Sequence, residues 1–184
     1  MPVRTARSLA VFMGLMTVLW SAMGLRPYPV AALIGAALGA AIVVGALLTA
    51  RRGSPAPSEP APRERRSRTV FRVAVAVEVA GALVAIIVLS RSGHQEYVMP
   101  AIALVVALHF FVFLIDQPGS TLHIATGTVG GAGAAAAIAL MATGTVGRDG
   151  GHALAATALA ACTFTYGAAF LRVITSITSG PSRA

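Results

Sequence analysis

The chain has 184 residues, of which 57% are hydrophobic and only 11% are charged, and its mean hydropathy is +0.81. Soluble domains carry about 25% charged residues, so this composition excludes an ordinary soluble globular protein. The same hydrophobicity excludes a disordered chain. The formal net charge of +8 comes from arginine alone, because the chain has no lysine. In a polytopic membrane protein the positive-inside rule explains this excess, so we expect no nucleic-acid partner.

Charged residues divide the sequence into uncharged runs of about the 20 residues that a helix needs to cross a bilayer. Backbone groups in lipid must bond internally, so each run is predicted to be a helix. We expect an all-α fold, a polytopic transmembrane bundle of six helices in one domain. The predicted helices cover about 8–25, 29–50, 70–90, 98–115, 121–143 and 152–177, and a cytoplasmic Pro/Arg-rich linker covers 51–69.

The first run has a second interpretation. Arg4 and Arg7 precede it, as basic residues precede the apolar part of a signal peptide. The run is long for a signal peptide, and bulky Trp20 lies close to the only loose match to a cleavage site. A retained transmembrane helix is therefore favoured, and cleavage is the alternative.

Two helices carry glycines at small-xxx-small spacing, which lets helix backbones approach closely. Gly35 and Gly39 lie in the second helix, and Gly127 and Gly131 lie in the fifth. Two inverted three-helix repeats would make these helices counterparts, a 3+3 arrangement common in transporters. Chance spacing in a chain rich in alanine and glycine is the alternative. The glycine faces also offer a surface for a homodimer.

The linker combines prolines with a cluster of four arginines: Arg63, Arg65, Arg66 and Arg68. A proline-rich stretch is expected to be extended or disordered. A polybasic cluster beside a membrane helix attracts anionic lipid head groups by about 1 kcal/mol per arginine, and a pure topology signal is the alternative. With both termini in the cytoplasm, only Arg26, Arg91 and Arg148 lie outside, so this orientation is predicted. Arginine without lysine is typical of a GC-rich bacterial genome, so we expect the bacterial plasma membrane.

Five polar residues lie within the predicted helices or at their edge, all in the cytoplasmic half: Glu78, His109, Asp116, His123 and Arg172. Charged groups inside a bilayer are costly and usually face the bundle interior. At 1.5 Å per residue, Glu78 lies about 12 Å and His109 about 10 Å from the cytoplasmic ends of their helices. Small residues share the faces of Glu78, His123 and Arg172, so we expect these three side chains to point inward. The face of His109 carries Phe113 and Asp116.

These residues predict a polar site that opens to the cytoplasm. Glu78 and His109 would exchange a proton, because histidine titrates near neutral pH. Asp116 and His123 would form a second pair, and Arg172 would neutralise Glu78 or hold an anionic substrate. The alternative is structural, with pairs that fix the helix register and an arginine that snorkels to the interface. A metal ion is less favoured because the spacing matches no metal motif, so we expect no metal and no cofactor.

The sequence contains no Walker loop, dinucleotide fingerprint or nucleophile elbow, so we expect that the chain is not an enzyme. The polar site instead indicates a small proton-linked transporter or permease, whose substrate the sequence does not identify. A non-catalytic membrane accessory or scaffold protein is the alternative.

Three segments carry a resemblance to known proteins: Phe71–Glu78, Val105–Phe111 and Leu122–Gly127. Together they resemble an uncharacterised family of small bacterial six-helix integral membrane proteins with a Val-Val-x-x-His-Phe-Phe segment. That family has a glutamate on one helix, Val-Val-Gly-x-His-Phe-Phe on the next and a following histidine, and Ala107 stands where it has glycine. The resemblance implies no known activity, but it marks Glu78, His109 and His123 for testing.

Overall fold

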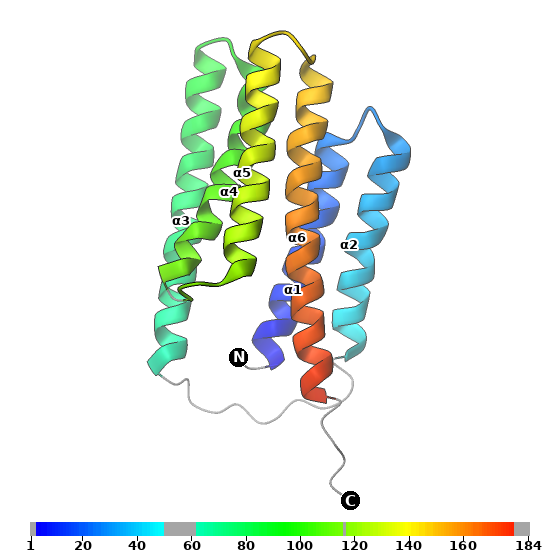
Figure 1. The fold of residues 1–184 in the computed structure, drawn as a ribbon, viewed down its shortest axis with the longest axis vertical. Helices are drawn as coiled ribbons and strands as arrows, with labels where there is room; N and C mark the ends of the chain where they lie inside the picture. Colours follow the sequence, from blue (N-terminus) through cyan, green and yellow to red (C-terminus); the bar gives the residue numbers. More distant parts are fainter. Residues whose placement is uncertain (1–2, 50–61, 116, 179–184) are drawn as a thin grey trace, which may run out of the picture. The chain divides into compact units, whose positions relative to one another are not determined.

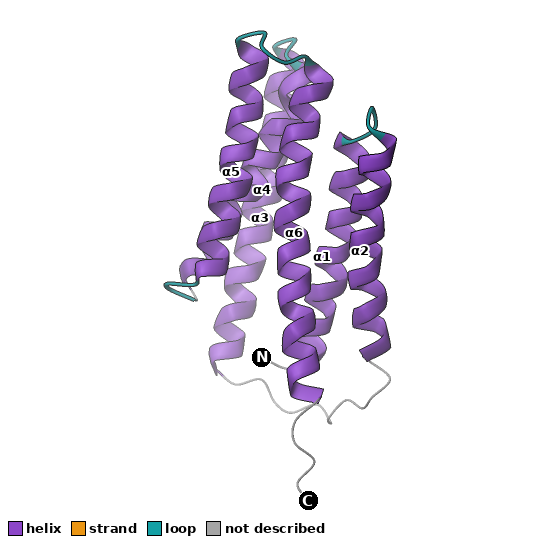
Figure 2. Ribbon diagram, turned by 45° about the vertical axis from the view of Figure 1, so that its right-hand side comes forward, coloured by secondary structure: helices purple, strands orange, loops and turns teal. Residues whose placement is uncertain are grey.

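The computed structural model describes residues 3–49, 62–115 and 117–178, with the side chains of 62–68 and 177–178 left out. The described residues form helices and no strands (Figure 2). The six long helices are α1 (Val3–Gly24), α2 (Pro29–Thr49), α3 (Pro62–Arg91), α4 (Val98–Val112), α5 (Thr121–Ala142) and α6 (Arg148–Thr178). Two short 3₁₀ segments flank α4, namely η2 (Gln95–Tyr97) and η3 (Phe113–Ile115). The all-α class and the number of long helices are confirmed.

Each of the six helices is long and apolar enough to cross a membrane. Large apolar side chains stay exposed along them, for example Val30 on α2 at 73% and Val84 on α3 at 59%. Extended apolar surface of this kind is unfavourable in water, whereas lipid tails accommodate it. The chain is therefore a multi-pass integral membrane protein.

The start of α3 differs from the prediction, because the helix begins at Pro62 and the linker was expected to run to residue 69. Proline is favoured at the first helical position, where its missing N–H needs no partner, and arginine and glutamate are good helix formers. The linker arginines thus lie on the first turns of α3: Arg63, Arg65, Arg66 and Arg68. The remainder of the predicted linker, 51–61, lies outside the described residues.

Two other helices begin earlier than the uncharged runs suggest. α1 begins at Val3 and includes Arg4 and Arg7, and α6 begins at Arg148. A helix end reaches the polar head-group region, where long basic side chains are tolerated. Asp149 in the first turn of α6 also interacts favourably with the helix dipole.

The helices form two compact units (Figure 1). The first contains α1, α2 and the second half of α6, and the other contains α3, α4, α5 and the first half of α6. The boundary along α6 falls between Cys162 and Thr163. The described helices thus do not cluster as two halves of three, because α6 is divided between the two units and α3 packs against α4. A repeat relation between the two sets of three helices stays a prediction.

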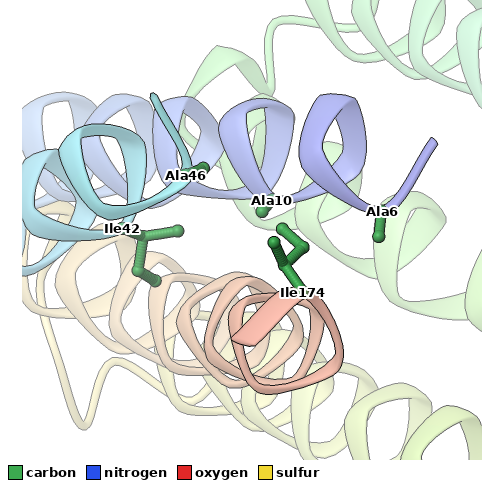
Figure 3. Close-up of a cluster of buried hydrophobic side chains, with 5 residues drawn as sticks. All are labelled: Ala6, Ala10, Ile42, Ala46 and Ile174. Atoms are coloured by element: carbon green, nitrogen blue, oxygen red, sulfur yellow. The ribbon is translucent and has the colours of Figure 1, made fainter. Parts of the chain in front are cut away.

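In the first unit, a buried cluster joins three helices (Figure 3): Ala6 and Ala10 of α1, Ile42 and Ala46 of α2, and Ile174 of α6. The alanines are 0% exposed, and they leave room for the larger isoleucine side chains between the helices. The beginning of α1 and the end of α6 therefore lie at the same end of this unit. Both helix ends then face the same side of the membrane, as an even number of crossings requires.

α1 and α2 form a hairpin whose backbones approach closely at glycine. A Cβ atom added at Gly39 would lie 2.6 Å from the carbonyl oxygen of Gly14, and one added at Gly35 would clash with Ser21. The predicted packing role of Gly35 and Gly39 is confirmed. Hydroxyl groups reinforce this unit, since the Oγ1 atoms of Thr17 and Thr163 share a buried hydrogen bond of 2.9 Å.

In the second unit, α4 contacts both α3 and α5. A Cβ at Gly81 of α3 would lie 2.9 Å from Val105, and a Cβ at Gly127 of α5 would lie 2.8 Å from the Phe111 ring. Gly131 is less tightly packed, because its Cβ would meet only Ala107 of α4, at an ordinary contact distance of 3.9 Å. Gly39 and Gly127 are buried within the chain, whereas Gly35 and Gly131 are half-buried, and the homodimer stays a prediction.

Candidate functional site

The second unit contains a carboxylate paired with an imidazole. Oε2 of Glu78 on α3 lies 2.9 Å from Nδ1 of His109 on α4. The side chain of His109 is 10% exposed and that of Glu78 is 29% exposed, and both belong to segments apolar enough to span the membrane. Within the described residues Nδ1 makes no hydrogen bond of good geometry, so the contact is close but not linear. The predicted proximity of these two groups is confirmed.

Local sequence explains why these two side chains meet. Glu78 shares its helical face with small residues, of which Ala74 is buried and Ala82 and Ala85 are half-buried. Gly81, one turn beyond Glu78, lets α3 lie close to Val105 of α4. Close approach brings a short carboxylate side chain within reach of the imidazole.

Aromatic rings surround the imidazole of His109. The Phe113 ring of η3 meets it edge-on, with centroids 5.3 Å apart, and the neighbouring Phe110 ring lies at 4.5 Å. Phe71 of α3 stacks on Phe113, with centroids 6.2 Å apart and an interplanar angle of 9°. Apolar rings exclude water and lower the local dielectric, which strengthens the attraction between a carboxylate and an imidazolium.

His123 of α5 lies beside the same aromatic group. It is 7% exposed, and its ring centroid is 5.5 Å from that of Phe113. Thr126, Gly127 and Gly130 on its face are buried, as predicted. The structure thus brings Glu78, His109 and His123 into one region. The predicted partner of His123, Asp116, lies outside the described residues.

Arg172 contradicts the prediction of an inward-facing side chain. It is exposed on α6, and Thr165 on the same face is exposed as well. The buried stripe of this half of α6 instead contains Thr163, Tyr166 and Ile174. Burying a guanidinium without a partner costs several kcal/mol, so an exposed position is favoured. Arg172 also belongs to the first compact unit, whereas Glu78 belongs to the other.

The opposite end of the second unit carries a smaller polar group. Nε2 of His152 on α6 lies 2.8 Å from the carbonyl oxygen of Glu96, and Nδ1 of His94 lies 3.5 Å from the Glu96 carboxylate. His94 is 61% exposed, so this pair is weak in water. Across the described ranges, no three histidine, cysteine or acidic residues are placed to hold a metal ion.

Sequence reasoning placed Phe113 on the face of His109 but gave it no role, and it did not single out Phe71. The signal for Phe113 is its spacing, four residues after His109 and therefore on the same helical face. The spacing of Phe71, seven residues before Glu78, is a similar signal. Neither spacing shows that the two rings stack on each other, because that contact joins different helices.

Comparisons with protein-family models, with curated proteins and with solved structures find no match to this chain.

Proposed function

We propose that the chain is a small proton-linked transporter or permease in which Glu78 and His109 hold and exchange the proton. One observation carries this proposal, namely the 2.9 Å contact between the carboxylate and the imidazole within apolar helices. A neutral acid–imidazole pair and a carboxylate–imidazolium pair differ only in the position of one proton between these atoms. The proton can therefore pass between the two groups without leaving a single unpaired charge in the membrane. Uptake of a second proton gives the pair a net charge of +1, and release of its proton gives a net charge of −1.

Partial exposure supports this role, because a pair that exchanges protons must reach water or a substrate. The Glu78 side chain is 29% exposed, so neighbouring protein side chains do not seal off the carboxylate. We place the first turns of α3 and both chain termini in the cytoplasm on the positive-inside rule, in the bacterial plasma membrane. Reporter fusions at residues 60 and 149 test this orientation, and an external signal at 60 would contradict it.

The basic start of α3 supports a second part of the proposal. Four arginines precede the apolar segment that begins at Thr69: Arg63, Arg65, Arg66 and Arg68. On a helix beside the membrane surface, they would bind anionic lipid head groups. Native mass spectrometry of the full chain should show bound anionic lipid that is lost when all four become glutamine. Equal retention in this variant would contradict lipid binding there.

The transport proposal is tested with purified protein in vesicles that contain a pH-sensitive dye. We expect proton flux above that of empty vesicles when a pH gradient is imposed under a clamped membrane potential. Glu78→Gln should reduce the flux to the level of empty vesicles, because glutamine cannot carry the proton. Glu96→Gln is the matched control, since this glutamate lies in the η2 segment outside the pair, and it should keep the flux.

Two results would contradict the proposal. Wild-type flux equal to that of empty vesicles would exclude proton movement through the chain, and full flux in Glu78→Gln would exclude the pair. The alternative, an accessory or scaffold protein, is favoured by the fact that the pair joins α3 to α4. It predicts that Glu78→Gln lowers the thermal midpoint while the wild type already shows no flux.

A further inference from the structure

We propose that Phe113 is a positioning residue that separates two proton-holding groups, the Glu78–His109 pair and His123. This inference rests on the proposed function and names a residue that controls where the proton can go. Its basis is that both imidazoles contact the same phenyl ring, with centroid distances of 5.3 Å and 5.5 Å.

The chemistry of the ring gives the reason. Protons move between side chains along hydrogen bonds, and a phenyl ring has no group that donates or accepts a conventional one. An apolar ring also excludes the water molecules that would bridge the two histidines. Phe71 of α3 stacks on Phe113 and covers one face of its ring. The Phe113 ring and the Phe71 ring stacked on it therefore keep a proton held by His109 from reaching His123.

The backbone holds this ring at a change of winding. Phe113 is the first residue of η3, directly after α4 ends at Val112, and its N–H is shared between the carbonyl oxygens of Phe110 and Phe111. A 3₁₀ turn rotates the chain by about 120° per residue, compared with about 100° in an α-helix. The local winding therefore sets the direction of the Phe113 side chain, and a change in winding would move the ring.

Other ionisable groups on the surrounding elements are few. α3, α4 and α5 all contact η3. On their described side chains in this half of the membrane, the ionisable groups are Glu78, His109 and His123, together with Arg72, which is exposed next to Phe71. Asp116 follows η3 directly but lies outside the described residues. The two histidines and the one glutamate are thus the groups between which the ring can control proton transfer.

The test replaces the ring with one of similar shape that can carry a proton. Phe113→His should raise the proton flux of the reconstituted full-length chain about tenfold over the wild type. Adding His123→Gln should remove this increase, because the new path ends at His123. Phe111→His is the matched control, since Phe111 lies on the same stretch but contacts Gly127, and its flux should equal that of the wild type.

A second variant, Phe113→Ala, tests the same point by leaving space for water, and its excess flux should also disappear with His123→Gln. Labelling of Cys162 with a maleimide dye during heating reports whether each variant is folded. The inference is wrong if folded Phe113→His or Phe113→Ala keeps wild-type flux. It is also wrong if the increase survives His123→Gln, since that result indicates a general leak. Because the readout is the excess over the wild type, its failure is distinct from the loss of flux expected in Glu78→Gln.

Discussion

Replacing Gly39 with alanine should separate α1 from α2. The added Cβ would lie 2.6 Å from the Gly14 carbonyl oxygen and 2.9 Å from the backbone nitrogen of Val18, whereas ordinary contact begins at 3.4 Å. These atoms belong to the backbone and cannot rotate away, so the helices must move apart by about 0.8 Å. Overpacking of this kind costs about 1–3 kcal/mol, and we expect the upper part of that range because two backbone atoms collide.

The single tryptophan provides the assay, since Trp20 lies on α1 and is 6% exposed. Its fluorescence during heating in detergent should show a midpoint lowered by roughly 4–10 °C in Gly39→Ala. Gly45→Ala on the same helix is the control, because its Cβ would first meet the mobile end of Leu171 at 3.3 Å. It should cost less than about 0.5 kcal/mol. Equal midpoints for both variants would refute the close approach of the two backbones.

Three further predictions concern single contacts. Thr17→Val removes the buried hydrogen bond to Thr163 and should lower the free energy of unfolding by about 1 kcal/mol in the Trp20 assay. Thr128→Val is the control, because Thr128 is exposed, and it should leave stability unchanged. Equal effects of the two variants would contradict the hydrogen bond. Cys162 is 3% exposed, and its thiol donates a hydrogen bond to the Thr126 carbonyl oxygen at 3.3 Å. A maleimide should therefore label this thiol only as the chain unfolds. Rapid labelling of the folded chain would contradict the burial of Cys162. His152→Gln breaks the contact with the Glu96 carbonyl oxygen and should cost about 1 kcal/mol by Cys162 labelling, while His94→Gln should be neutral. A larger cost for His94→Gln than for His152→Gln would contradict the contact between His152 and Glu96.

Hydrophobic run lengths alone predict the six helices, because a helix that crosses lipid must satisfy its own backbone and have the right length. The same rule places the boundaries less well. It uses charge to end a helix, yet α3 continues through its arginines to Pro62, since a helix can extend beyond the hydrocarbon layer. How helices associate is predicted least. Glycine spacing correctly identifies Gly39, whereas Gly131 has the same spacing and no close neighbour except Ala107.

The candidate site shows a similar division. Depth along each helix places Glu78 and His109 at one level, and the contact between them follows once α3 and α4 are neighbours. Arg172 is predicted wrongly because face composition does not show which side of α6 meets another helix. Phe113 is overlooked because its importance comes from contacts with rings on α3 and α5, which no spacing within one helix can show.

The most direct test of the proton pair exchanges its two members. Glu78→His and His109→Glu should each lower proton flux in vesicles strongly, because two imidazoles or two carboxylates cannot form the oppositely charged carboxylate–imidazolium pair. The double variant restores one carboxylate and one imidazole at the same contact, so its flux should return to within about tenfold of the wild type. A folded double variant as inactive as the single variants, or single variants that keep wild-type flux, would contradict the assignment of Glu78 and His109 as the proton-exchanging pair.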